Sequence, residues 1–265
     1  MNPHKHTPRI KKDLKSRLKR KDLTIGSWIT IGHPSIAEIM SMNDFDWLTI
    51  DLEHSPISLN QAQQLIQVIE LSGITPLVRV GENNPNIIKR VMDAGAHGVI
   101  VPMVNSKEDA LKALEAVKYP PIGTRGVGLA RAQGYGLDFS GYLKWVNEKS
   151  ILIVQIEHYE AVNNLEQILE INEIDGFMVG PYDLSASLGK PGNFDHPEVK
   201  DAINKVMNIA SKFDNAVPGF HVIQPAAEEV INKIKEGYKF IAFSLDTLFL
   251  SMNCKNELAK LKDKK

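Results

Sequence analysis

The chain has 265 residues, of which 43% are hydrophobic, and a formal net charge of −1 at pH 7. This length allows one α/β barrel or two smaller domains, each with a sizeable core. The lone cysteine, Cys254, excludes an internal disulfide framework and fits a reducing compartment. No apolar stretch approaches the ~18 residues of a membrane span, and the N-terminus lacks a signal-peptide core. We therefore expect a cytoplasmic protein without a membrane partner.

The first 22 residues form a basic segment. They carry nine Lys or Arg and two Asp, so their formal charge is +7 and that of the remainder is −8. Such an arm can bind nucleic acid or anionic lipid. However, Ile10, Leu14 and Leu18 recur every four residues and form one apolar stripe on a helix. We therefore predict that residues 1–22 form a helix packed on the protein, with no nucleic-acid partner, and that residues 23–265 form the main domain.

Eight short apolar runs follow along the chain, and each is a candidate strand. They are Thr24–Ile31, Asp46–Leu52, Thr75–Val80, Gly98–Met103, Ile151–Glu157, Gly176–Gly180, Val217–Val222 and Phe240–Ser244. Helical patterns lie between them, and no linker or low-complexity tract interrupts the order. Strand–helix units repeated eight times predict a single (β/α)8 TIM barrel of the α/β class, with an N-terminal helix.

The predicted helices have recognisable ends. Ser58 can cap a helix that stops at Gly73, Asn84–Pro85 reads as an N-cap and first helical residue, and Ser106 with Asp109 resembles a capping box. Further helical segments are predicted at Phe194–Phe213, at Gln224–Gly237 and in the solvated C-terminal tail Lys255–Lys265.

In such barrels the chemistry lies at the carboxyl ends of the strands. Alternation along a strand places Asp51 and Glu53 on one face, and likewise Gln155 and Glu157. Further polar residues that close the runs are Arg79, Asp183, His221 and Asp246. Carboxylates that meet at one mouth are costly to bury unless a cation or an Arg compensates them. This requirement indicates a metal site.

The type of ligand narrows the choice of metal. Glu157 and Asp183 come just past the neighbouring fifth and sixth strands, and no Cys lies near them. A few hard oxygen ligands suit Mg²⁺ or Mn²⁺ better than Zn²⁺. The alternative is that one of these carboxylates pairs with Arg79 or caps a helix, since acidic strand ends are common in barrels of every function.

Six segments resemble, in order, the motifs of the HpcH/HpaI aldolase family, the class II pyruvate aldolases. They are Phe45–His54, Val101–Val104, Tyr119–Gly128, Val154–Glu157, Gly180–Ser185 and Asp246–Thr247. The resemblance runs from about Leu14 to about Leu250. It implies a (β/α)8 barrel, often a hexamer or trimer of dimers, that uses Mg²⁺, Mn²⁺ or Co²⁺ to add pyruvate to an aldehyde reversibly.

The resemblance also implies roles for single residues. Glu157 and Asp183 would hold the metal, and Arg79 would hold the keto oxygen of pyruvate. His54, oriented by Asp51, would serve in proton transfer. The alternatives are that Arg79 is only an ion-pair partner of buried acids and that His54 is a loop residue satisfied by Asp51.

The same resemblance implies a substrate pocket around the metal. Gln155 would lie beside the metal, and backbone N–H groups around Pro181, Tyr182 and Asp183 would hold the substrate carboxylate. Trp28, at the end of the first strand, either lines this pocket or belongs to the core.

The expected reaction is reversible cleavage of a 4-hydroxy-2-oxo acid into pyruvate and an aldehyde, through a metal-stabilised enolate. The acid would be a 2-keto-3-deoxy sugar acid or a 4-hydroxy-2-oxo-dioate. Leu52 and His221 stand where smaller or apolar residues are expected, which leaves the aldehyde open. One alternative is a related lyase that cleaves an acyl-CoA thioester, for which Arg125 and Arg131 are the basic candidates, or that mainly decarboxylates oxaloacetate. The other is a non-catalytic binding barrel.

Overall fold

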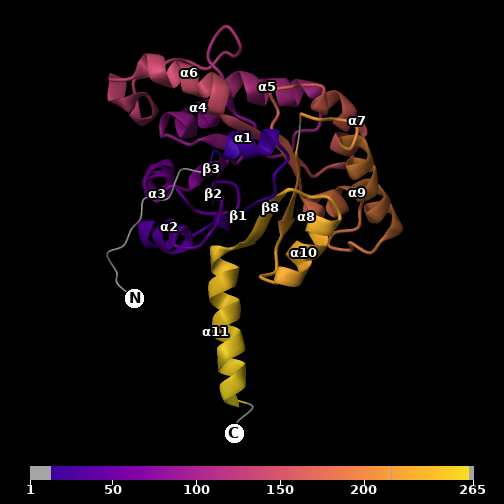
Figure 1. The fold of residues 1–265 in the computed structure, drawn as a ribbon. Coiled ribbons are helices and arrows are strands. Elements are labelled where there is room, and N and C mark those ends of the chain that lie inside the picture. The colour runs from indigo at the N-terminus through magenta and orange to yellow at the C-terminus, as the bar shows by residue number, and fades with distance from the viewer. Residues whose placement is uncertain (1–12, 216, 263–265) are drawn as a thin grey trace.

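Residues 13–215 and 217–262 are described here from a computed structural model. Eight parallel strands close a barrel in chain order (Figure 1). They are β1 (Thr24–Ile29), β2 (Trp47–Asp51), β3 (Thr75–Arg79), β4 (Gly98–Val101), β5 (Ile151–Ile156), β6 (Gly176–Val179), β7 (Val217–Val222) and β8 (Phe240–Leu245). Each predicted run overlaps one strand, so the predicted (β/α)8 barrel is confirmed.

Helices accompany the strands, and most of them cover the outside of the barrel (Figure 1). They are α1 (Leu14–Lys19), α2 (Pro34–Ser41), α3 (Leu59–Leu71), α4 (Pro85–Asp93), α5 (Lys107–Val117), α6 (Phe139–Lys149), α7 (Tyr159–Leu169), α8 (Pro181–Ser187), α9 (Pro197–Ala210), α10 (Ala227–Lys235) and α11 (Asp246–Lys262), with a 3₁₀ helix η1 at Arg131–Gly136. Within the described residues, no helix combines the length and the apolar character needed to cross a membrane.

Local capping sets the ends of the predicted helices. Ser58 forms a capping box with Gln61 at the start of α3, and Gly73, with a φ of 80°, follows its end. Ser106 and Asp109 form the same motif at α5. The predicted segment Phe194–Phe213 is helical only from Pro197, because proline takes the first helical position there.

Side chains from alternate strands fill the barrel in layers. Strand register and alternation place Trp28, Arg79, Gln155 and His221, from β1, β3, β5 and β7, in the layer nearest the carboxyl ends. The guanidinium carbon of Arg79 lies 4.3 Å from the centroid of the Trp28 ring, and the His221 ring centroid lies 5.4 Å from it. This polar layer forms the floor of the barrel mouth.

Helix α1 closes the opposite, amino-terminal end of the barrel. Leu14 and Leu18 are buried in the same apolar cluster as the barrel interior. Lys15 is buried too: its Nζ lies 2.5 Å from Asp175 Oδ1 and donates to the Ser150 carbonyl at 2.9 Å. The predicted packing of the N-terminal helix therefore holds for Leu14 and Leu18, whereas Ile10 lies outside the described residues.

We expect Lys15→Ala to destabilise the fold by about 3–5 kcal/mol, because it leaves the Asp175 carboxylate buried without its partner. The matched control is Lys19→Ala, one turn later on the exposed side of α1, where a change of less than about 0.5 kcal/mol is expected. Denaturant unfolding of both variants measures the difference, and equal stabilities would show that the buried pair does not anchor α1.

Candidate active site

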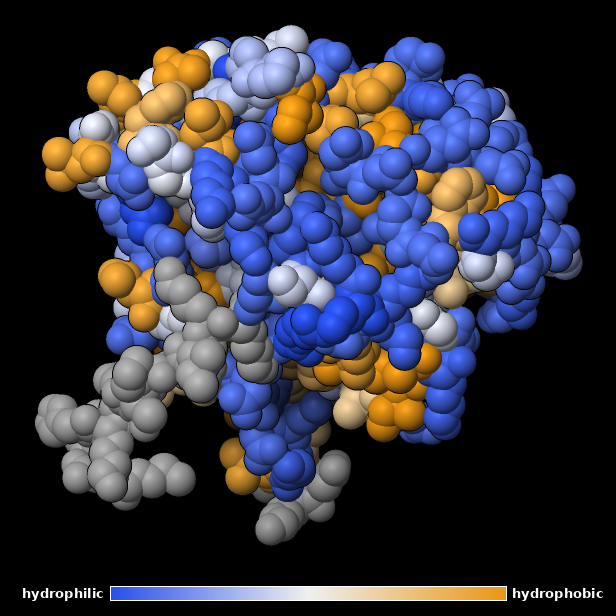
Figure 2. Space-filling view, turned by 45° about the horizontal axis from the view of Figure 1, so that its top comes forward, coloured by the Kyte–Doolittle hydropathy of each residue, from blue (hydrophilic) through white to orange (hydrophobic). Residues whose placement is uncertain are grey.

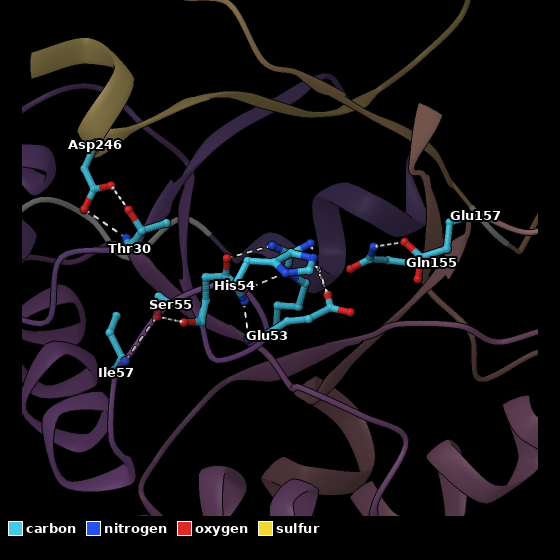
Figure 3. A network of polar contacts seen from close by, with 10 residues as sticks. Thr30, Glu53, His54, Ser55, Ile57, Gln155, Glu157 and Asp246 are labelled. Carbon is cyan, nitrogen blue, oxygen red and sulfur yellow. Dashed lines mark hydrogen bonds and ion pairs between the residues drawn. The ribbon is translucent and has the colours of Figure 1, made fainter. Parts of the chain in front are cut away.

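The barrel mouth collects side chains from the ends of several strands. Figure 3 shows Glu53 and His54, from the segment after β2, pointing towards Gln155 and Glu157 at the end of β5. The residues after β2 and those at the end of β5 are far apart in the sequence, and closure of the barrel brings them together. The sequence-based expectation that the strand ends converge is met for these side chains.

Arg79 is held firmly in this mouth. Its Nε donates to Asp51 Oδ1 at 2.9 Å and its Nη2 to Asp51 Oδ2 at 2.7 Å, while its Nη1 lies 3.2 Å from Glu53 Oε2. Its guanidinium also stacks on the buried Trp28. Although burial favours the neutral acid, the bonds from Arg79 hold the pKa of Asp51 below its usual value. The guanidinium is therefore fixed in orientation and keeps N–H groups for a ligand.

The Asp51 carboxylate and the His54 ring are not joined in the way the sequence led us to expect. Asp51 Oδ1 accepts hydrogen bonds from the backbone N–H groups of Glu53 and His54, at 3.0 and 3.3 Å. The His54 ring instead lies beside Glu53, with Nε2 3.9 Å from Oε2, and the side chain is 66% exposed. Asp51 therefore orients Arg79 and the backbone of the loop, and leaves the imidazole open to substrate and solvent.

Glu157 is a buried acid of the site, with only 3% of its surface exposed. Its Oε1 accepts from the Met103 N–H at 2.7 Å and its Oε2 from Gln155 Nε2 at 2.6 Å. Met103 has a positive φ of 52°. Gly180 packs so closely on Glu157 that an added Cβ would come within 2.9 Å of the glutamate side chain. The pKa of Glu157 is raised to about 7, mainly by burial and also by the negative charges of Glu53 and Asp183.

Two more carboxylates face the same space. Asp183 lies in the first turn of α8 and is exposed. Burial raises the pKa of Glu53 to about 7 against the attraction of Arg79, and Asp51 and Asp183 add repulsion. The sequence placed Glu53 on the same face as Asp51 but gave it no role, and only the fold reveals that it touches Arg79.

These residues fit a divalent cation. Two acids with raised pKa values, repelled by a third, form a centre of negative charge that a cation would compensate. The Oε1 atom of Gln155 is buried with no hydrogen-bond partner among the described residues. Across the described part of the chain, no group of three or more His, Cys, Asp or Glu is placed to hold a metal ion. A cation on Glu157 and Asp183 would thus leave positions for water and substrate.

The start of α8 forms one wall of the mouth. Pro181 opens the helix, so the N–H groups of Tyr182 and Asp183 are the first that it presents. The Tyr182 ring is half exposed and packs edge-on against Phe194, with centroids 4.8 Å apart. This wall offers hydrogen-bond donors at the place expected from the sequence for a substrate carboxylate.

Three other residues singled out from the sequence lie elsewhere or serve the fold. Arg125 pairs with Asp93, the last residue of α4, and Arg131 pairs with Glu70, in the last turn of α3, both at the amino-terminal side of the barrel. Neither arginine can therefore form a basic groove at the mouth. Asp246 accepts from the Thr30 N–H and hydroxyl at 2.9 and 2.6 Å, which ties the end of β1 to α11 (Figure 3).

Comparison with known proteins agrees with this geometry. The model of the HpcH/HpaI aldolase/citrate lyase family matches residues 24–251. The 2-keto-3-deoxy-L-rhamnonate aldolase of Klebsiella pneumoniae subsp. pneumoniae is 36% identical over 250 residues, which cover 94% of this chain and 92% of that enzyme.

Solved structures give the same result. A HpcH/HpaI aldolase/citrate lyase family protein from Burkholderia cenocepacia J2315 has a TM-score of 0.89 at 30% identity, covering 94% of this chain and 98% of that one. A HpcH/HpaI aldolase from Desulfitobacterium hafniense DCB-2 has a TM-score of 0.85 at 27% identity, covering 94% and 96%. The chain therefore belongs to the HpcH/HpaI aldolase/citrate lyase family and is a carbon–carbon lyase of the class II aldolase type.

Proposed function

We propose that this protein is a divalent-metal-dependent aldolase that reversibly cleaves a 4-hydroxy-2-oxo acid into pyruvate and an aldehyde. The observation that carries the proposal is the pairing, in one mouth, of the acids Glu157 and Asp183 with an arginine fixed by Asp51. The similarity to an enzyme named for 2-keto-3-deoxy-L-rhamnonate favours a substrate of the 2-keto-3-deoxy sugar acid type.

Arg79 stabilises the enolate, and a bound metal would add to this stabilisation. When bound by Glu157 and Asp183, Mg²⁺, Mn²⁺ or Co²⁺ would supply a Lewis acid for the keto group. Arg79 donates its remaining N–H groups to the keto oxygen, on which negative charge develops as the bond between C3 and C4 breaks. Because Asp51 and Trp28 already fix the guanidinium, it does not have to reorganise during the reaction.

His54 moves the proton. In cleavage it takes the proton of the substrate's 4-hydroxyl group, and in the reverse reaction it returns that proton to the new alkoxide. Its exposed ring can exchange protons with solvent, and the Glu53 carboxyl group lies 3.9 Å away. An imidazole serves both directions because its ring nitrogen can accept a proton and return it.

The substrate carboxylate belongs at the start of α8. The N–H groups of Tyr182 and Asp183 have no partner within the first turn of the helix, and helix N-termini favour anions. Gln155 keeps the Glu157 carboxylate oriented beside this position. The substrate would then lie over the Trp28 ring, with its carboxylate towards α8.

The alternative reactions fit less well or share the same intermediate. A CoA thioester needs a basic groove at the mouth, and Arg125 and Arg131 lie at the other end of the barrel. Oxaloacetate gives the same enolate by loss of CO2, so we propose its decarboxylation as a second reaction of this site.

A panel of 4-hydroxy-2-oxo acids tests the proposal. We expect pyruvate release that a chelator abolishes and added Mg²⁺, Mn²⁺ or Co²⁺ restores. None of the hydrogen bonds or ion pairs of the described site residues involves a lysine, so borohydride with pyruvate is expected to leave the protein unmodified. Chelator-resistant cleavage or a trapped pyruvate adduct would contradict the metal mechanism, and the trapped adduct would indicate a Schiff base.

We also propose that the protein acts as a homo-oligomer, and as a hexamer in particular. Helix α11 projects from the barrel, and its Leu250, Leu258 and Leu261 are exposed (Figure 1). Figure 2 shows a mainly hydrophilic face on which apolar side chains gather at the upper left, the region of α4 to α6 in Figure 1. Leu129 and Leu137, between α5 and α6, are exposed as well. Such surfaces are typical of subunit contacts.

Sedimentation velocity at micromolar concentration is therefore expected to show an assembly larger than the 29.5 kDa chain. Leu258→Lys should shift it towards smaller species, since a charge on α11 opposes burial of that helix face. A monomeric wild-type protein would contradict the proposed assembly.

A further inference from the structure

His221 is a buried titratable side chain that the proposed mechanism leaves without a task. It extends from β7 into the floor of the mouth, in the layer that also holds Trp28 and Arg79. Both His221 and Arg79 pack on the Trp28 ring, at 5.4 and 4.3 Å from its centroid. A substrate held by Arg79 therefore lies within reach of His221.

The hydrogen bonds of the imidazole define its tautomer. The ring is bonded to the backbone carbonyl of Ser244, while Nε2 is buried and has no partner among the described residues. Nδ1 is therefore the nitrogen that carries the proton and donates to Ser244, and Nε2 presents a lone pair. An opposite tautomer would leave the Ser244 bond unmade.

The backbone of β8 is shaped for this bond. Ser244 has a φ of 53°, and the register of the β1–β8 pairing shifts between Gly26 and Trp28. The Ser244 carbonyl is thereby left out of the regular ladder and accepts from side chains, including Ser27 Oγ at 3.2 Å. The pKa of His221 is lowered to about 4, mainly by burial and also by the charge of Arg79, so the ring is neutral at neutral pH.

A buried acceptor without a donor is unfavourable compared with the apolar side chain that could occupy the same place. Trp28 Nε1 and Gln155 Oε1, in the same layer, are likewise buried without partners in the described part of the chain. This floor is therefore arranged for a polar ligand. The donor that Nε2 requires cannot come from pyruvate, because a 2-keto acid anion has no O–H or N–H group. It can come from a hydroxyl group on the aldehyde part of the substrate.

We propose that His221 determines the aldehyde specificity of this enzyme: its Nε2 accepts a hydrogen bond from a hydroxyl group of the aldehyde portion, so that 2-hydroxyaldehydes are used in preference to their deoxy analogues. The role rests on the proposed aldolase function and deepens it. An apolar side chain at this position would discriminate much less, because an apolar wall senses a hydroxyl group only through its size.

The test compares aldol addition of pyruvate to lactaldehyde and to propanal, which differ by one hydroxyl group. For the wild-type enzyme we expect kcat/KM to favour lactaldehyde by about 10-fold or more, since a hydrogen bond to a buried acceptor is lost with propanal. His221→Leu should bring this ratio close to one through loss of lactaldehyde addition. His221→Gln, which retains an acceptor, should recover part of the preference.

Exchange of the methyl protons of pyruvate in D2O, followed by NMR, serves as the control reaction. It needs the metal, Arg79 and His54 but no aldehyde, so His221→Leu should change it by less than about twofold if the fold is intact. A normal exchange rate with an unchanged lactaldehyde-to-propanal ratio overturns the role of His221 alone. A parallel fall of exchange and of both additions assigns His221 a structural role and also overturns it. If the wild-type enzyme shows no metal-dependent exchange, the proposed aldolase function itself is wrong.

Discussion

Asp183→Asn and Glu157→Gln are each expected to lower the affinity for Mn²⁺ by more than about 100-fold and to abolish pyruvate release at ordinary metal concentrations. Loss of a group that only supports a ligand costs about 10–100-fold in metal affinity, and loss of one of two charged ligands should cost more. The two variants differ in their other effects. Asp183 is exposed, so its replacement should leave stability unchanged, whereas Glu157 also accepts the Met103 N–H in the interior.

Calorimetric titration with Mn²⁺ measures the affinities, and the exposed Asp195→Asn variant serves as a matched control with wild-type binding. Glu53→Gln adds a further comparison, because it removes a carboxylate from the same mouth without removing a proposed ligand. Unchanged Mn²⁺ binding in both Asp183→Asn and Glu157→Gln would place the metal elsewhere.

The second large effect separates His54 from Arg79. Aldol cleavage and methyl exchange both require a group that moves a proton, whereas decarboxylation of oxaloacetate reaches the enolate by losing CO2. His54→Ala should therefore slow the first two reactions by about 10²–10⁴ and decarboxylation much less. Arg79→Ala should slow all three together by about 10²–10³, because the keto oxygen is common to them.

The contacts of Asp51 sharpen this comparison. If Asp51 served to orient the His54 ring, Asp51→Asn would reproduce the pattern of His54→Ala. The Asp51 carboxylate instead accepts two hydrogen bonds from Arg79. Asp51→Asn should therefore slow all three reactions together, as Arg79→Ala does. Arg79→Lys should recover only part of the activity, because an ammonium group lacks the fork that matches a carboxylate.

The rates of aldol cleavage, methyl exchange and oxaloacetate decarboxylation, measured for each variant, distinguish the roles of His54 and Arg79. Circular dichroism must accompany them, since Arg79→Ala leaves the buried Asp51 without its partner. An equal loss of all three rates in His54→Ala would mean that His54 binds substrate or supports the loop, and the proton would then have to be moved by another group.

The local sequence was sufficient for the elements and for most of the residues of the site. Capping at Ser58 and Ser106 depends on side chains three residues apart, so it can be predicted without a fold. The apolar runs of the strands are equally local. Because parallel strands end at one mouth, the polar residues that follow them, such as Glu157 and Arg79, could be predicted to converge.

Only the tertiary structure decided the partners of those residues. Asp51 meets Arg79 because the register of β2 with β3 sets them side by side, and no local pattern encodes that register. Lys15 meets Asp175 across 160 positions of the chain, and Met103 turns its N–H to Glu157 through a positive φ. The bulge at Ser244, in a neighbouring strand, presents a carbonyl to Nδ1 of His221, and Nε2 is left without a partner among the described residues. The sequence by itself thus determined the barrel and the groups at its mouth. The pairing of these groups was decided by barrel closure, because hydrogen bonds between distant strands depend on where each strand is placed against the next.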